Sequence, residues 1–163
     1  MATPQQALNA AYEGWNQANL DRYLELYDDE IRLHGYSPEP MDKAEVRGFY
    51  EMVFGAFDSP KLAFHETLWH GDSCAIRFTM TGRHVAEYMG VPATGTEIVL
   101  PGITILHFRA DRVLERFSQA DMLGLLVQIA PCRTRITARS RSGSSPRDAG
   151  RVGRGACGSS PLL

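Results

Sequence analysis

The order of helical and strand patterns along the chain is the strongest constraint on its fold. Before Pro60, apolar residues recur at helical spacing, most clearly in a wide stripe over residues 46–57. After Pro60, β-branched and aromatic residues dominate four segments separated by turns, at 61–70, 73–83, 96–108 and 112–119. Helices followed by a run of long strands predict an α+β domain, in which one curved antiparallel sheet wraps over N-terminal helices.

Capping signals predict where the helices begin. Thr3 and Gln6 flank Pro4 in the pattern of a capping box, and Asn19 precedes a second short helix. Asp42 and Glu45 open the third helix, and residues 122–129 form a last short helix. A short alternating segment, residues 30–36, predicts a strand between the second and third helices.

A strongly curved sheet over helices leaves a cavity between the two layers, which suits a hydrophobic small molecule. Residues 98–108 are apolar at nearly every position, which predicts a strand buried on both faces. A second copy of the chain, packed sheet against sheet, would bury the outer face. We therefore expect a homodimer or a tetramer.

Charge divides the chain near residue 130. The chain has 17 Lys and Arg and 19 Asp and Glu; seven arginines and one acid follow Pro131, leaving 10 basic and 18 acidic residues in 1–130. We expect residues 1–130 to form the domain and the Arg/Ser/Gly-rich tail, 131–163, to be disordered. A basic arm can bind nucleic acid or a membrane. No aromatic residue or recognition motif accompanies these arginines, so we expect neither partner and interpret the tail as a non-functional extension.

Three further patterns bear on location and cofactors. No apolar run approaches the roughly 18–20 residues that span a bilayer, and the N-terminus has no signal-peptide pattern. Cys74, Cys132 and Cys157 show no CxxC spacing, which favours free thiols in a reducing cytoplasm. Paired histidines at metal-ligand spacing and nucleotide-binding glycine motifs are both missing from the sequence, so we expect no metal and no cofactor.

Two segments resemble the SnoaL-like polyketide cyclases of the NTF2-like superfamily. Residues 82–95 contain Gly82-Arg83-His84 and Gly90-Val91-Pro92-Ala93-Thr94-Gly95, similar to the family's G-x-H-x-G…G-x-P-P-T-G. Residues 113–129 are similar to its I-x-E-x-W…D-x-x-G-L-L-x-Q-L ending. The resemblance covers about residues 5–130 and implies a cone-shaped α+β fold, usually dimeric or tetrameric.

The resemblance also implies a reaction. Cyclases of this family act in secondary metabolism, including antibiotic biosynthesis, and close a ring of a polycarbonyl substrate by an aldol condensation without cofactor or metal. A carboxylate removes the proton, and apolar walls fold the substrate. Along the similar ending, Ser118 stands where the family has its catalytic Asp, and Thr104 where it has the partnering His. Serine does not accept a proton near neutral pH, so other residues carry the chemistry here or the reaction differs.

Asp121, His34 and His65 are the catalytic candidates that remain. Asp121 is the acid next to the family's site positions, although an Asp before residues 122–129 also suits an N-cap. His34 and His65 each lie in a predicted strand beside apolar neighbours. His84 matches a family position, a match that a role in the following turn also explains.

The substrate-binding candidates are Trp15, Phe49, Thr104, Arg116 and Ser118. Trp15 matches a pocket aromatic of the family, and Phe49 belongs to the stripe of the third helix. If residue 108 pairs with 112, one face of the last hairpin carries Thr104, Leu106, Leu114, Arg116 and Ser118, and the other carries Ile103, Ile105, His107, Val113 and Phe117. The apolar pattern favours the second set inside, whereas the resemblance favours the first.

Arg116 has two interpretations. On a pocket face, Arg116 would bind an enolate oxygen or a carboxylate; on the surface, it would pair with Glu115 or Glu97. The sequence favours a cofactor-independent cyclase-type enzyme that works by acid/base catalysis. One alternative is an epoxide hydrolase or isomerase on the same fold; the hydrolase needs an Asp-Arg-Asp set, of which Asp121 and Arg116 supply only two members. The other alternative is a non-catalytic protein that binds a hydrophobic ligand.

Overall fold

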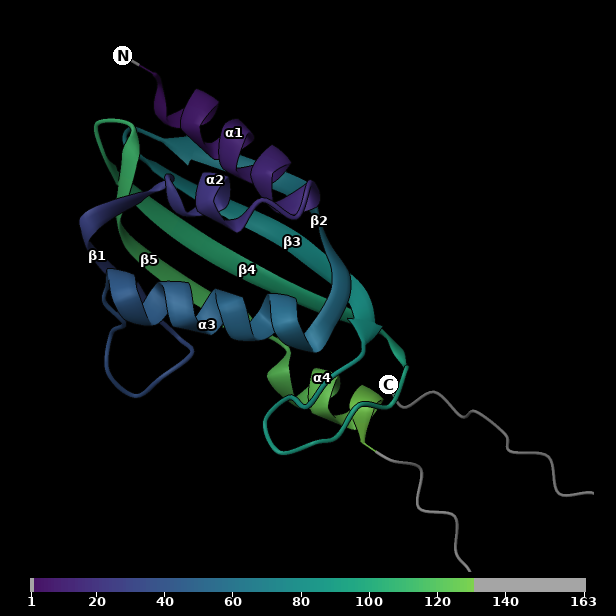
Figure 1. Ribbon diagram of the computed structural model, residues 1–163. Coiled ribbons are helices and arrows are strands. Elements are labelled where there is room, and N and C mark those ends of the chain that lie inside the picture. Colours follow the sequence, from purple (N-terminus) through teal and green to yellow (C-terminus); the bar gives the residue numbers. More distant parts are fainter. Residues whose placement is uncertain (1, 131–163) are drawn as a thin grey trace, which may run out of the picture. The chain divides into compact units, whose positions relative to one another are not determined.

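The computed structural model describes residues 2–130 (Figure 1). Each of the four helices in this range begins at a residue whose side chain accepts a hydrogen bond from a backbone N–H of the first helical turn. Thr3 with Gln6 and Asp42 with Glu45 form complete capping boxes at α1 (Pro4–Asn16) and α3 (Lys43–Ala56). Asn19 caps α2 (Leu20–Leu24), and Asp121 caps α4 (Met122–Ile129). The predicted helix starts are therefore confirmed.

Five strands form one sheet in the order β1-β5-β4-β3-β2. The strands are β1 (Tyr27–His34), β2 (Phe57–His70), β3 (Ser73–His84), β4 (Glu97–Arg109) and β5 (Arg112–Ala120). Strands β2 to β5 pair as the predicted antiparallel meander. Strand β1 instead joins β5 in parallel, so the sheet is mixed at this edge.

Strand β2 begins earlier than the sequence predicts. It starts at Phe57, directly after α3, and its pairing with β3 shifts between Asp58 and Lys61. Ser59 has a φ of +48° at this irregularity. Asp58, Ser59 and Pro60, which precede the predicted strand 61–70, therefore belong to an irregularity within a longer strand.

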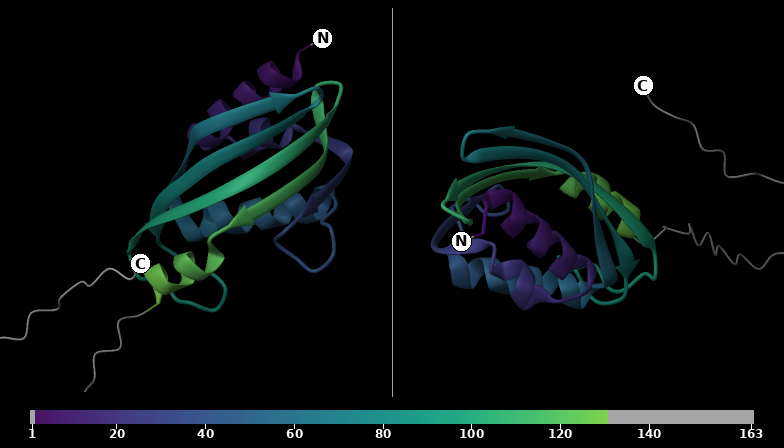
Figure 2. Two further views of the ribbon diagram at one scale, coloured as in Figure 1. Left: turned by 180° about the vertical axis from the view of Figure 1, so that it is seen from behind. Right: turned by 90° about the horizontal axis from the view of Figure 1, so that it is seen from above.

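The sheet curves around α1, α2 and α3, which all lie on its concave side (Figure 2). Viewed from behind, the convex face shows no helix of the described residues across it. The curved sheet wrapped over N-terminal helices is thus confirmed, and it has the NTF2-like arrangement.

A bulge in the last hairpin decides which residues of β5 face inward. Phe108 pairs with Val113 and His107 with Glu115, so Leu114 is an extra residue. Val113 therefore lies on the buried face, the same face as Arg116 and Ser118. The pairing of 108 with 112 considered above is not the one observed, and Val113 belongs with the inner set.

The end of β1 packs directly on β5. Gly35 has a φ of +108°, and a Cβ there would lie 1.9 Å from the carbonyl oxygen of Ser118. Only glycine permits this approach. Backbone hydrogen bonds between Leu33 and Met41 then close the loop that carries Tyr36.

The convex face of the sheet is apolar and exposed in the single chain. Val99, Ile103, Ile105 and Phe117 are between 40 and 54% exposed. Strand β4 is therefore buried on one face only within the chain, and burial of the other face by a second copy stays a prediction.

The predicted disordered tail, 131–163, lies outside the described residues. Within residues 2–130, no helix has the length and apolar character needed to cross a membrane.

Candidate functional site

A cavity lies between the concave face of the sheet and the three N-terminal helices, and its volume, mouth included, is about 760 Å³. Most of its lining is aliphatic or aromatic. The polar exceptions are hydroxyl groups, one indole and one guanidinium, from Tyr12, Trp15, Tyr23, Tyr36, Tyr50, Tyr88, Thr104 and Arg116. The apolar and aromatic character of its lining suits a hydrophobic small molecule.

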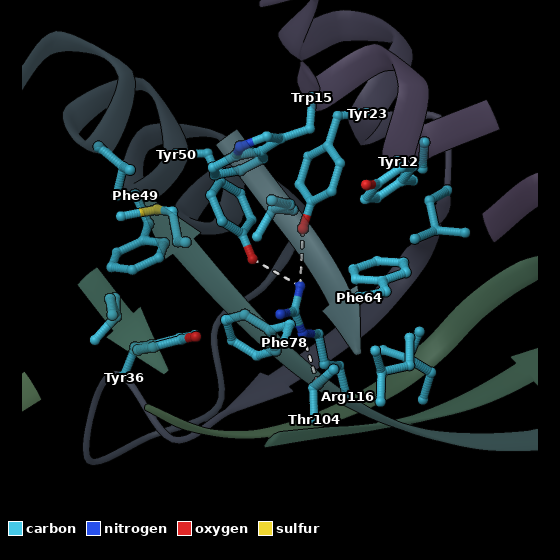
Figure 3. A pocket seen from close by; sticks show the side chains of 18 of the residues that line it. Tyr12, Trp15, Tyr23, Tyr36, Phe49, Tyr50, Phe64, Phe78, Thr104 and Arg116 are labelled. Carbon is cyan, nitrogen blue, oxygen red and sulfur yellow. Dashed lines mark hydrogen bonds between the residues drawn. The ribbon is translucent and has the colours of Figure 1, made fainter. Parts of the chain in front are cut away.

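Arg116 is the single charged residue of this lining among residues 2–130. It is 7% exposed. Its Nε donates to Thr104 Oγ1 at 3.0 Å and to Ser118 Oγ at 2.9 Å. Its Nη1 donates to the hydroxyls of Tyr23 at 3.0 Å and Tyr50 at 2.7 Å (Figure 3).

The hydroxyl of Tyr27 also accepts from Nη1 of Arg116. Tyr27 and Tyr23 are in turn hydrogen-bonded, with 3.0 Å between their hydroxyl oxygens. Arg116 is thus held by neutral groups from β1, α2, α3, β4 and β5, which we call the hydroxyl cage: Tyr23, Tyr27, Tyr50, Thr104 and Ser118.

The cage leaves the charge of Arg116 uncompensated. Burial raises the pKa of Tyr27 and of Tyr50 above the ordinary value, although the neighbouring Arg116 acts in the opposite direction. Both phenols are therefore neutral at physiological pH, while a guanidinium stays protonated. A buried charge is normally paired with its opposite, so this cation is an unusual feature of an otherwise apolar cavity.

Aromatic rings form the wall opposite the sheet. Trp15 packs edge-on against Tyr23, Tyr50 and Phe54, with ring centroids 4.9, 5.5 and 4.7 Å apart. Tyr36 stacks on Phe49 at 4.7 Å. These rigid contacts hold the rings as fixed walls around a ligand.

The sequence-predicted binding residues meet at this cavity. Trp15, Phe49, Thr104 and Arg116 line it, and Ser118 lies buried behind Arg116, with its Oγ 2.9 Å from Thr104 Oγ1. The surface ion pair considered for Arg116 is not formed. Glu115 instead contacts His34, and Glu97 is exposed at the start of β4.

The three predicted catalytic residues lie elsewhere. His34 contacts Glu115 at 3.0 Å and stacks on the exposed ring of Phe117. His65 is exposed and contacts Thr79 Oγ1 at 2.8 Å. Asp121 is exposed, and its carboxylate accepts from the backbone N–H of Gly124 at 2.8 Å. None of the three lines the cavity.

Sequence reasoning missed the tyrosines of the hydroxyl cage as functional residues. Tyr23 and Tyr27 are four residues apart, the spacing of a helical pair, and Tyr50 lies in the apolar stripe over residues 46–57. Neither pattern points to a functional role, and Tyr27 in fact begins β1. The available signal was that three phenols fall at predicted inward positions of an otherwise apolar interior, where each hydroxyl needs a partner.

His84 has a structural environment. It is fully buried, packs against Phe57, and its Nδ1 lies 3.0 Å from Thr94 Oγ1. It therefore anchors the loop that contains the glycine and proline motif. Residues 2–130 contain no cluster of three or more His, Cys, Asp or Glu side chains able to hold a metal ion.

The fold and the cavity define an NTF2-like small-molecule domain. A family match over residues 5–129 then makes the assignment specific: the chain belongs to the SnoaL-like polyketide cyclase family. No curated protein matches the chain.

Solved structures share this fold. AclR from Streptomyces galilaeus, a proposed hydroxylase, is 23% identical with a TM-score of 0.72, over 77% of this chain and 94% of its own. IdmH from Streptomyces antibioticus, a proposed polyketide cyclase, is 24% identical with a TM-score of 0.66, over 78 and 98%. TsrD from Streptomyces laurentii is 21% identical with a TM-score of 0.69, over 77 and 93%. At these identities, the similarity establishes the fold alone.

Proposed function

We propose that this chain is a cofactor-independent enzyme of the polyketide cyclase type, acting on a hydrophobic polycarbonyl compound. The observation that carries the proposal is the buried guanidinium of Arg116 at an apolar cavity. The cavity walls would fold a flexible substrate so that two of its carbon atoms meet, which replaces a random encounter by a fixed geometry.

Arg116 would stabilise the oxygen atom on which negative charge develops. In an aldol closure, a carbon between two carbonyl groups loses a proton, and the resulting enolate attacks a second carbonyl carbon. The new alkoxide oxygen then takes up a proton. A guanidinium in a water-poor site lowers the energy of such an oxyanion, and donors of this kind are worth about 10²–10³ in rate.

The proposal differs from the sequence-based hypothesis in its acid/base residue. Asp121, His34 and His65 do not line the cavity, and neither a carboxylate nor an imidazole lines it within residues 2–130. Burial raises the pKa of Tyr27 and of Tyr50, so these two phenols are neutral and hold their protons strongly. They are therefore hydrogen-bond donors and acceptors rather than bases, and the substrate proton must leave by another route.

A second candidate function is a non-catalytic protein that binds a hydrophobic ligand. The same lining supports it, because a cavity with no general base among its described residues is suited to binding. An epoxide hydrolase is less well supported, since the described lining supplies Arg116 but no carboxylate.

Ring closure of a synthetic aromatic poly-β-ketone, followed by chromatography, separates these functions. We expect wild-type protein to accelerate closure and Arg116→Met to lose at least about 100-fold of that acceleration. Arg77→Met is the matched control, because Arg77 is an exposed arginine whose nearest carboxylate oxygen, on Glu66, is 3.7 Å away. Tight binding of the poly-β-ketone without acceleration would favour the binding protein, and equal rates for wild type and Arg116→Met would contradict the role of Arg116.

The proposal extends to assembly and setting. We propose a homodimer that buries the convex face, where Val99, Ile103, Ile105 and Phe117 are exposed. We further propose that it works in the cytoplasm, in secondary metabolism such as antibiotic biosynthesis. Light scattering at micromolar concentration tests the dimer, and a monomeric mass would contradict it.

A further inference from the structure

The two ends of the Arg116 guanidinium differ in their surroundings. The N–H groups of Nε and Nη1 are directed at the five hydroxyls of the cage. Nη2 has no hydrogen-bond acceptor within the part of the chain that the structure describes. It is not fully enclosed by protein atoms, so part of its surface is accessible. Since Arg116 lines the cavity, the exposed surface of Nη2 faces the cavity.

Tyr36 approaches this end of Arg116 from across the cavity. Its hydroxyl points into the cavity, towards the side of Phe78 and Arg116, as Figure 3 shows, and its phenol group is near enough to interact electrostatically with Arg116. Its ring is held by stacking on Phe49, and its hydroxyl makes no hydrogen bond to any other residue of 2–130. A ligand oxygen between the two residues would therefore receive N–H donors from Arg116 and an O–H donor from Tyr36.

We propose that Arg116 Nη2 and Tyr36 form a subsite for an anionic oxygen that the ligand carries before any reaction. The ligand class is a hydrophobic, ring-sized organic acid: a carboxylic acid or an ionised enol. The inference deepens the proposed function, and rests on it only in using the same cavity as the ligand site.

The argument for an anion is electrostatic. Neutral hydroxyls orient around a cation but do not cancel its charge, and burial weakens the screening that water would supply. An anionic oxygen at Nη2 would complete the missing pair with a charge-assisted hydrogen bond, roughly twice as strong as a neutral one. A neutral ester or ketone of the same shape gains much less at this position.

Selection of an ionised ligand also accounts for the lack of a base in the described lining. An acidic 1,3-dicarbonyl compound gives up its proton to water before it binds, so that the enolate enters the cavity ready to attack. The charged or titratable groups that face the subsite from the cavity lining are Arg116 and the phenols Tyr23, Tyr36, Tyr50 and Tyr88, and Tyr27 lies buried behind Arg116. Arginine and neutral phenols keep their protonation between pH 5 and 8, so affinity should follow the ionisation of the ligand.

The test compares acids with a neutral analogue by quenching of tryptophan fluorescence or by calorimetry. The probes are 2-naphthoate for the carboxylate, 2-acetyl-1-tetralone for the ionisable enol, and methyl 2-naphthoate as the neutral control. We expect at least one acid to bind about 10- to 100-fold more tightly than the ester, as a hydrogen bond to a charged group implies. Tighter binding of 2-naphthoate would identify the anionic oxygen as that of a carboxylate, and tighter binding of 2-acetyl-1-tetralone would identify it as that of an ionised enol.

Variants locate the effect at the subsite. Arg116→Met should remove the preference for the acid, whereas Arg77→Met should keep it. Tyr36→Phe should weaken acid binding about fivefold and leave the ester unchanged, because the loss of one neutral donor has a smaller effect than the loss of a cation. This second variant leaves the hydroxyl cage intact, so it decides the matter if Arg116→Met does not fold.

Equal affinity for acids and ester, or a preference for the acid that survives Arg116→Met, would overturn the inference. The results that test the subsite can be distinguished from the results that test the proposed enzyme function. Acid binding that depends on Arg116, without turnover of any poly-β-ketone, supports the subsite and contradicts the enzyme. Turnover that depends on Arg116, with no preference for acids, supports the enzyme and contradicts the subsite.

Discussion

Two neighbouring residues of β5 show how differently the two faces of the sheet treat charge. Glu115 faces outward, where its side chain is 42% exposed and contacts His34 at 3.0 Å. Arg116 faces inward, where it is buried among hydroxyls and has no carboxylate partner within residues 2–130. The outer contact is of a kind that contributes little, because water screens it. The inner charge is costly to bury, so it is the better indicator of function.

The largest expected difference between the faces concerns aromatic packing. Trp15→Ala should lower the free energy of unfolding by about 3–5 kcal/mol, because it removes a large side chain that is only 2% exposed and leaves a cavity in its place. Phe117→Ala, on the outer face, should lower the free energy of unfolding by roughly 1 kcal/mol or less at concentrations low enough for the protein to be monomeric, where Phe117 is 40% exposed. Urea titration measures both. A loss for Phe117→Ala as large as that for Trp15→Ala, dependent on protein concentration, would indicate that a second copy covers this face.

Arg116→Met should change the stability in the opposite direction. We expect the free energy of unfolding to rise by about 1–4 kcal/mol, because an apolar side chain replaces a buried charge. The remaining hydroxyls still pair, with Tyr23 and Tyr27 3.0 Å apart and Thr104 and Ser118 2.9 Å apart. Thermal unfolding checks this. A marked destabilisation would mean that the cation is needed to hold the cage together.

Asp28, at the edge of the sheet, makes a pH-dependent contribution to the stability of the fold. A hydrogen bond from the backbone N–H of Glu30, together with the Arg109 guanidinium, lowers the pKa of Asp28, although burial acts against them. A lowered pKa stabilises the fold above the unfolded value of about 3.9, and this stabilisation is lost as the pH falls through the folded value. Asp28→Asn should therefore cost about 1 kcal/mol at pH 7 and progressively less below pH 4. A constant difference in urea titrations across this range would contradict the assignment.

Substitution on the convex face should barely alter the stability of one chain. We expect Ile103→Lys to change the free energy of unfolding by no more than about 0.5 kcal/mol, since Ile103 is 54% exposed. It should nevertheless shift the mass measured by light scattering from dimer to monomer. An unchanged dimer would mean that the copies meet elsewhere.

The smallest expected effect belongs to Asp121→Asn. Asn caps a helix about as well as Asp, so the stability should hardly change. Ring-closure activity should also stay within about twofold of wild type, because Asp121 is exposed at the start of α4 rather than in the cavity lining. A large loss of activity would return Asp121 to the role of catalytic acid.

Local signals were sufficient for the helices and most strands. Thr3, Asn19, Asp42 and Asp121 cap helices as predicted, because a capping interaction is complete within a few residues of the chain. Alternation located the strands, but their edges depended on tertiary contacts. The bulge at Leu114 and the parallel pairing of β1 follow from packing between distant segments, which no local pattern specifies.

The candidate site was predictable in part for the same reason. The inward position of Arg116 and Thr104 was one of two faces left open by alternation, and the family resemblance favoured it. The tyrosines around Arg116 lie 66 to 93 positions away from it in the chain. Their convergence depends on how α2, β1 and α3 pack over the sheet, so the sequence alone did not connect them.

The parallel pairing of β1 with β5 has a consequence for how the protein is made. His34 pairs with Phe117, and the hydrogen bond from Arg116 to Tyr23 joins residues 93 positions apart. During synthesis, helices α1 to α3 leave the ribosome long before β5, so the hydroxyl cage assembles only after nearly the whole domain has emerged. Contacts of such long range slow folding. We expect its assembly to be a late step, in both the nascent chain and the refolding protein.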